Sequence, residues 1–182
     1  CYMGTAEVCY DFKDVVDYQL VSAMEVPAYG FPYNTDLLVN LFEGTVDGYT
    51  KACQEFVDYY EEVYEDGEQA WATIALVDSK EVNNLTQQIK NQITQHKETL
   101  ADFDVSSLQE YGQSTAPNIA SDLRQFVEEL NGGEVPSEFD AQLNKTVLFK
   151  DCMEIARPSN YGVDAENFSG LGIYIPVFSR KK

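Results

Sequence analysis

The sequence is poor in histidine and in basic residues, and both shortages exclude functions. One histidine occurs among 182 residues, and 12 Lys and Arg stand against 31 Asp and Glu, which gives a formal net charge of −19. Binding to nucleic acid and to anionic membranes depends on Lys and Arg to release counterions, so the composition argues against both. The charge favours cationic partners, although an acidic surface that serves solubility alone is the commoner explanation of such a charge.

Cysteines are also few, and no long apolar run occurs. The four cysteines match neither a zinc pattern nor a Cys-x-x-Cys motif, and they are too sparse for a disulfide scaffold. Cys9, Cys53 and Cys152 lie among apolar residues, which predicts buried thiols. No apolar run approaches the ~20 residues that span a bilayer. The hydrophobic content of 44% is nevertheless sufficient for a folded core.

Hydrophobic periodicity predicts helices that alternate with strands. Helices are expected at 6–16, 35–44, 52–67, 78–100, 119–132 and 137–155, and strands at 18–26, 71–77 and 171–177. The strand WATIALV is nearly all apolar, as in a parallel sheet covered on both faces. This order predicts an α/β fold. Because three strands are few for a helix-flanked sheet, further strands are expected upstream of Cys1 or on another chain.

Cys1 is the candidate nucleophile. If a strand leads into Cys1, the thiol lies at the carboxyl end of that strand, where open α/β sheets place their chemistry. A helix that begins near Thr5 would lower the pKa of the thiol and favour the reactive thiolate, and its first amides can donate to an oxyanion. Gly4 leaves room for a substrate carbonyl. From these residues alone, a buried inert cysteine is still the commoner explanation.

Two segments, one at each end of the chain, resemble the clostripain family of cysteine peptidases. The resemblance lies in CYMGTAEVCYDFKDVVDYQLVSAMEVP at 1–27 and returns in SGLGIYIP at 169–176. It implies a caspase-like three-layer fold, with a mainly parallel central sheet flanked by helices and completed by an upstream chain. Residues 1–182 would form the carboxyl-terminal part of this domain, with a catalytic core at 1–80 and a helical region and closing strand at 81–182.

The resemblance also implies an activity, namely that of a cysteine endopeptidase that cleaves after Arg or Lys. It further implies that the protein is secreted or periplasmic in a bacterium. Because the chain begins at Cys1, we expect it to be one product of a cleaved precursor. The Asp-Ala pair that precedes the nucleophile in the family is not in this sequence. The resemblance implies that the Asp of this pair helps to bind the basic P1 side chain. Gly172 stands where Ser is more usual.

The base that activates the thiol is expected on another chain. A cysteine peptidase needs a base, normally His, within hydrogen-bond reach of the thiol. His96 lies on or beside the apolar stripe of its predicted helix, which indicates a structural or boundary role. In the resembled family the catalytic His precedes the Cys. The resemblance therefore implies an upstream light chain that supplies the His of a Cys/His dyad.

A substrate-binding edge is implied by the same resemblance. Backbone pairing with the peptide substrate is assigned to Ser22, Ala23, Met24 and Glu25. Glu25 is the only carboxylate of residues 19–31, and a carboxylate here would attract a basic P1 side chain, although a solvated acid is the usual fate of Glu. Tyr29 is expected to pack on the stem of the P1 side chain, near a position where relatives can carry a further acid.

Two other functions stay open. The first is a non-catalytic caspase-like interaction domain. The second is an amino-terminal-nucleophile hydrolase, which would use the α-amine of Cys1 as its base but normally needs an αββα fold with many antiparallel strands. No cofactor is predicted, with calcium as the alternative because some relatives need it. The acid clusters 61–62 and 65–66 could bind calcium, but a solvated helix face and its end explain them better.

Overall fold

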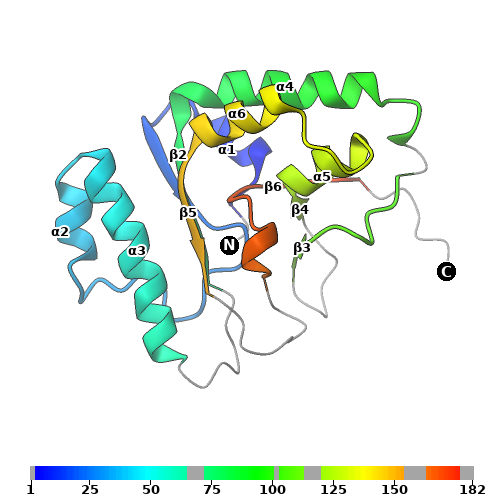
Figure 1. The fold of residues 1–182 in the computed structure, drawn as a ribbon. Helices are drawn as coiled ribbons and strands as arrows, with labels where there is room; N and C mark the ends of the chain where they lie inside the picture. Colours follow the sequence, from blue (N-terminus) through cyan, green and yellow to red (C-terminus); the bar gives the residue numbers. More distant parts are fainter. Residues whose placement is uncertain (1–2, 65–71, 101–102, 113–119, 154–162, 177–182) are drawn as a thin grey trace.

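The structure, a computed structural model, describes residues 3–64, 72–100, 103–112, 120–153 and 163–176. Two three-stranded antiparallel sheets lie next to each other with helices packed on them, so the predicted α/β class is confirmed (Figure 1). The helices are α1 (Ala6–Phe12), α2 (Leu37–Phe42), α3 (Val46–Val63), α4 (Val82–Gln95), α5 (Leu123–Leu130) and α6 (Ser137–Thr146), with short 3₁₀ turns η1 (Ser79–Glu81) and η3 (Ala165–Asn167).

The first sheet has the order β1-β2-β5, with β1 at Tyr18–Val21, β2 at Thr73–Asp78 and β5 at Val147–Cys152. Its central strand β2 is buried from Thr73 to Val77. Helix α3 packs on one face, where its aromatic residues join Ile74 and Leu76 in a single apolar cluster. Helices α4 and α6 pack on the other face, where Ala75 and Val77 belong to a second cluster. Coverage on both faces explains why the interior of β2, from Ile74 to Val77, is apolar.

The second sheet has the order β3-β4-β6, with β3 at Glu110–Tyr111, β4 at Ala120–Asp122 and β6 at Gly172–Ile173. Helix α5 follows β4 without a loop and buries four apolar residues of one face, namely Leu123, Phe126, Val127 and Leu130. Spacing of three and four residues brings these side chains onto one stripe. The stripe contributes to the same apolar cluster as α4 and α6, so the two sheets share part of their core.

The direction of strand pairing differs from the expectation of a mainly parallel sheet. Every pair of named strands in the described part of the chain is antiparallel, and the parallel contact there is an isolated bridge between Thr5 and Gly172. The apolar run at 71–77 predicted coverage on both faces correctly, but burial carries no information about the direction of the neighbouring strands. Trp71 itself lies outside the described residues.

The expected helix at 137–155 is wrong in its second half. Helix α6 ends at Thr146, and Val147–Cys152 forms β5, which pairs with β2 along its length. Pairing with a buried central strand outweighs the helical spacing of the apolar residues in this segment. With β3 and β4 also unforeseen, residues 81–182 hold four of the six strands that the structure describes. The description of this half as a helical region is therefore incomplete.

Several other elements end earlier than predicted, while α3 begins earlier than predicted, at Val46. Helix α1 ends at Phe12 and β1 at Val21, while α4 ends at Gln95. The three cysteines expected to be buried, Cys9, Cys53 and Cys152, all lie in the interior, which confirms that prediction. Within the described part of the chain, no helix combines the length and apolarity that crossing a membrane would require.

Candidate active site

The predicted nucleophile, Cys1, lies outside the described residues, so the site is built from the residues that follow it. Met3 is the first residue described. Gly4 and Thr5 lie between the two sheets and connect them through the backbone. The Gly4 amide donates to the Ser22 carbonyl over 2.8 Å, and the Gly172 amide donates to the Gly4 carbonyl over 2.7 Å. The chain three residues after Cys1 is therefore fixed from both sides.

The close approach at this point requires the glycine at position 4. A Cβ added to Gly4 would lie 2.6 Å from the Ala23 nitrogen and 2.7 Å from the Ser22 carbonyl carbon. Both atoms belong to the backbone, so neither can move aside as a flexible side chain would. The sequence suggested that Gly4 makes room for a substrate carbonyl. The observed reason for a glycine here is contact with the chain after β1.

Helix α1 begins at Ala6 with Thr5 as its N-cap, close to the predicted start. The Val8 amide donates to the Thr5 hydroxyl over 3.4 Å, which is a side-chain N-cap. One turn into α1, the Glu7 carboxylate accepts from the Tyr174 amide over 3.0 Å. The helix is thus attached at its first turn to the segment that follows β6. Gly4, Thr5 and Glu7 together hold the start of α1 against the second sheet.

The proposed substrate-binding edge is buried and bent. Strand β1 ends at Val21, and Ser22, Ala23 and Met24 follow with at most 6% of their surface exposed. The Ser22 hydroxyl donates to the Met24 carbonyl over 2.9 Å. The chain bends at Ala23 and Met24, so the expected strand at 18–26 is interrupted after its fourth residue.

Thr73 at the start of β2 supports this bend. Its hydroxyl lies 2.9 Å from the Ser22 hydroxyl and accepts from the Met24 amide over 3.2 Å. Thr73 is fully buried, and these hydrogen bonds satisfy a polar group that would otherwise be costly in the interior. Sequence analysis did not identify Thr73. The available signal was a single hydroxyl inside the apolar run WATIALV.

Glu25 and Tyr29 lie at the exposed end of the same segment. Glu25 is half-buried, and the Tyr29 side chain is 66% exposed, with its ring centroid 6.5 Å from that of Tyr64. The loop that carries Tyr29 is held by Tyr60 of α3, whose hydroxyl donates to the Gly30 carbonyl over 2.6 Å. Burial, followed by the neighbouring Tyr64, raises the pKa of Tyr60 to about 12. Tyr60 therefore stays a hydrogen-bond donor at neutral pH.

The buried thiols differ chemically from a reactive cysteine. Burial, with a smaller contribution from Glu7, raises the pKa of Cys9 to about 12. Burial and then the Asp151 charge raise the pKa of Cys53 to about 12 as well. A thiol with such a pKa holds almost no thiolate at neutral pH, and the thiolate is the nucleophilic form. Neither Cys9 nor Cys53 is suited to catalysis.

His96 lies at the carboxyl end of α4. It is the C-cap residue of that helix and is partly exposed, and its amide donates to the Gln92 carbonyl over 3.1 Å. The position fits the boundary role expected from the sequence. His96 lines a shallow cavity together with Glu98 and Phe103, which follow α4, and with Glu129 of α5.

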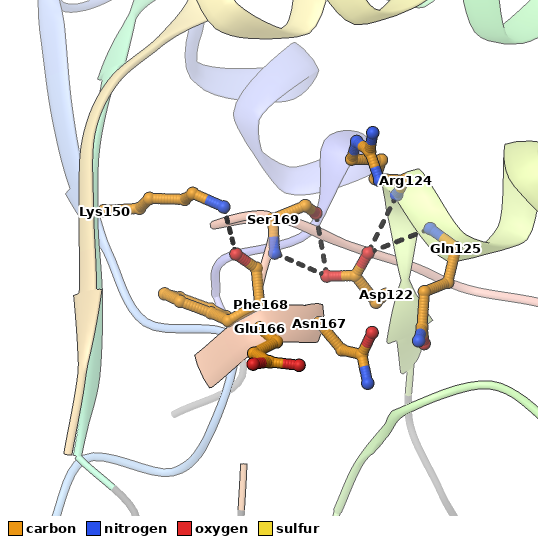
Figure 2. A pocket seen from close by; sticks show the side chains of 8 residues that line it. All are labelled: Asp122, Arg124, Gln125, Lys150, Glu166, Asn167, Phe168 and Ser169. Carbon is orange, nitrogen blue, oxygen red and sulfur yellow. Dashed lines mark hydrogen bonds between the residues drawn. The ribbon is translucent and has the colours of Figure 1, made fainter. Parts of the chain in front are cut away.

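A buried carboxylate, Asp122, organises the second sheet beside Gly4. One of its oxygens, Oδ2, accepts from the Tyr111 hydroxyl over 2.7 Å and from both the amide and the hydroxyl of Ser169, over 2.9 and 2.7 Å. The other, Oδ1, accepts from the Arg124 and Gln125 amides over 2.9 and 3.1 Å (Figure 2). Asp122 is fully buried, so five hydrogen bonds replace the water that its carboxylate loses.

Asp122 forms part of the lining of a polar cavity of about 290 Å³. On the opposite wall, the Lys150 ammonium donates to the Phe168 carbonyl (Figure 2). Burial lowers the pKa of Lys150, an effect that the charge of Asp122 partly offsets. Asp122 was not among the candidate residues predicted from the sequence. An Asp directly before the amphipathic segment 123–130 is an N-cap signal, but the predicted helix began at Ile119, which concealed it.

The described residues contain no cluster of metal-ligating side chains. No group of three or more His, Cys, Asp or Glu side chains is positioned there to hold an ion. Of the acid pairs considered for calcium, Glu61 and Glu62 are exposed at the carboxyl end of α3. The pair 65–66 lies outside the described residues.

Comparison with known proteins identifies relatives over nearly the whole chain. The profile of the family described as Clostripain family matches residues 1–162. A clostripain from Bacteroides thetaiotaomicron, solved with the peptide inhibitor BTN-VLTK-AOMK, is 31% identical with a TM-score of 0.76; the match covers 99% of this chain and 77% of that one. No curated protein matches significantly.

Two further solved structures are similar. A secreted C11 cysteine protease from Bacteroides thetaiotaomicron is 32% identical with a TM-score of 0.74, and the match covers 96% of this chain and 47% of that one. An inactive zymogen of a C11 protease from Parabacteroides distasonis is 28% identical with a TM-score of 0.74, with coverage of 97% and 50%. The chain therefore spans about half the length of these two relatives.

Proposed function

This chain belongs to the clostripain family, and we propose that it carries the nucleophile of a cysteine endopeptidase that cleaves after Arg or Lys. The observation that carries the proposal is the family match, which begins at Cys1 and runs through the bend at Ser22–Glu25. The fixed backbone at Gly4 supports it, because catalysis gains most when the reacting group is held in one place. The high pKa values of Cys9 and Cys53 leave those thiols unsuited to the reaction.

The proposed reaction uses a Cys/His dyad. A His takes the proton of the Cys1 thiol, and the thiolate attacks the scissile carbonyl to form a tetrahedral intermediate. The intermediate collapses to an acyl-enzyme when the His gives its proton to the leaving amine. Water, activated by the same His, then attacks the thioester and releases the acid product together with the free thiol.

We assign the His to an upstream light chain. His96 is the one histidine of the sequence, and it lies at the end of α4 next to α5, a position explained by its role as a helix boundary. The chain covers 50% of the zymogen from Parabacteroides distasonis, which leaves room in a complete protein for a second portion. A secreted relative supports a secreted or periplasmic location.

Selectivity for a basic P1 residue has two lines of support. A relative that is 31% identical was solved with an inhibitor whose peptide part, VLTK, ends in lysine. In this chain Glu25 provides a carboxylate at the exposed end of the buried segment 22–24, and the net charge of −19 attracts cationic peptides. Tyr29 follows Glu25 closely in the sequence and its ring is exposed. The ring is therefore available to cover the aliphatic stem of a bound Arg or Lys side chain.

The first test replaces the nucleophile in the complete protein. Cys1→Ala should abolish hydrolysis of Arg and Lys peptide substrates and leave the unfolding temperature unchanged. Cys9→Ala is the matched control: it removes a fully buried thiol, so it should lower stability while the remaining folded protein keeps its activity. Retained activity in Cys1→Ala would refute the proposal. A wild-type protein that folds but cleaves no peptide would favour the non-catalytic interaction domain instead.

The second test concerns Glu25. Glu25→Gln should weaken kcat/KM for Arg and Lys substrates relative to a neutral P1 substrate, by roughly 1–3 kcal/mol if the carboxylate contacts the cation directly. The exposed acid Glu43, at the end of α2, offers a control of equal charge change in Glu43→Gln. An equal effect of the two substitutions would reduce the role of Glu25 to that of general surface charge.

A further inference from the structure

The carboxylate of Asp122 is connected to Gly4 by a short series of hydrogen bonds. Its Oδ2 accepts both donors of Ser169. The Ser169 hydroxyl also contacts the Leu171 carbonyl at 3.2 Å, and the next residue, Gly172, donates its amide to the Gly4 carbonyl over 2.7 Å. Gly4 in turn follows Cys1 by three residues.

The segment 170–172 has no room to adjust independently of its neighbours. Gly170 adopts a φ of +93°, and a Cβ there would lie 2.9 Å from the Val147 side chain. A Cβ on Gly172 would lie 3.0 Å from that of Ala120. A densely packed segment transmits a displacement at one end to the other, because its atoms cannot relax into free space.

From this arrangement we propose that Asp122 is a positioning residue: its carboxylate holds Ser169 and, through the segment 170–172, fixes the backbone of Gly4, three residues after the nucleophile. The inference rests on the proposed function, since it takes Cys1 as the reacting group. Asp122 contacts neither substrate nor thiol in this scheme. It acts on the reaction through the placement of Gly4.

The hydrogen bonds of Asp122 allow a selective test. Asp122→Asn keeps the size of the side chain and keeps an oxygen for the Arg124 and Gln125 amides, and Asn is as good an N-cap as Asp. The amide NH₂ then faces the Ser169 amide, so a donor meets a donor. If the side chain flips, the same conflict arises at the start of α5. Ser169→Ala is the milder variant, because it removes the hydroxyl and leaves the Ser169 amide in place.

Tyr111→Phe provides the matched control. It removes a hydrogen bond of similar length to the same oxygen, Oδ2, but leaves both contacts to Ser169 intact. The ring that packs against Phe168 is kept. Tyr111→Phe should therefore lose stability as the other variants do, without a displacement of the segment 170–172.

The experiment measures kcat and KM on an Arg peptide substrate with the complete protein, well below the unfolding temperature of each variant. We expect Asp122→Asn to lower kcat by about 10-fold to 100-fold with KM within about 2-fold, as for a misplaced reacting group. Ser169→Ala should lower kcat in the same direction, and the double variant should lose no more than Asp122→Asn alone, because both act through one connection. Tyr111→Phe should stay within about 2-fold of wild type.

Equal losses of kcat in Asp122→Asn and Tyr111→Phe would overturn the inference, as would a wild-type kcat in Asp122→Asn. If Asp122→Asn does not fold, additive effects of Ser169→Ala and Gly172→Ala would overturn it equally. The rate of Cys1 alkylation by iodoacetamide separates this inference from the proposed function. It needs no peptide cleavage, and it should fall in Asp122→Asn relative to Tyr111→Phe even if the protein proves to cleave other substrates.

Discussion

Gly4→Ala tests whether Gly4 packs against the backbone of Ser22 and Ala23 as tightly as the structure indicates. The new Cβ would lie 2.6 Å from the Ala23 nitrogen and 2.9 Å from the Ser22 carbonyl oxygen. Overpacking of this kind costs roughly 1–3 kcal/mol. Separation of the chains would also weaken the 2.8 Å hydrogen bond from Gly4 to Ser22, which adds about 0.5–1.5 kcal/mol. The expected loss of unfolding free energy is therefore roughly 1.5–4.5 kcal/mol.

Urea unfolding of the complete protein measures this loss, and Gly44→Ala supplies the control. Gly44 has a φ of +67°, and a Cβ added there would meet no atom within 4 Å, so alanine at this position meets backbone strain of about 1–2 kcal/mol but no steric contact. Gly44→Ala should keep full peptidase activity. Gly4→Ala should lose more stability than the control and most of its kcat. A Gly4→Ala protein within about 0.5 kcal/mol of wild type would refute the tight contact.

Two further predictions concern titratable groups. His96→Gln should leave turnover within a few-fold of wild type, and a loss of ~100-fold with the fold intact would make His96 the catalytic base after all. The raised pKa of Cys53, about 12 against 9.0, predicts stability that is fully present below pH 9 and is lost as pH rises toward 12. In this range the free energy of unfolding should fall by about 1.4 kcal/mol per pH unit because of Cys53. Cys53→Ala should remove this contribution when urea unfolding is measured between about pH 9.5 and 11. The same pH dependence in Cys53→Ala and in wild type would contradict the assignment.

The helices were the most predictable part of the fold, and the short strands were the least. Spacing of three and four residues marks α3 and α4 in the sequence, because one face of each helix packs on a sheet. Strands β3 and β4 have two and three residues, too few for a period of two to be recognised. The segment 171–177 was predicted as a strand, and β6 occupies only Gly172 and Ile173 of it. The pairing of β4 with β6 joins Ser121 to Ile173, which no local pattern records.

The candidate site was predictable where residues resemble a known motif and unpredictable where the fold brings unrelated residues together. Residues 22–25 and Cys1 were assigned from the motif. Thr73 and Asp122 lie 49 and 47 residues along the chain from their respective partners, Met24 and Ser169. A single Thr in an apolar strand or an Asp before a helix has many local explanations. Only the three-dimensional contacts distinguish a support of the site from an ordinary polar residue.

Gly4 shows how a correct residue can be selected for an incomplete reason. The sequence pointed to a backbone position that needs space, and the structure agrees, since atoms of Ser22 and Ala23 occupy the volume of a Cβ. A glycine signals close approach but does not identify what approaches. Here the neighbour is the start of the proposed substrate-binding segment, so the same contact joins Gly4, three residues after Cys1, to that segment. A displacement of either one must move the other. Under the proposed function, substrate binding and bond cleavage should therefore depend on the same small set of packed atoms.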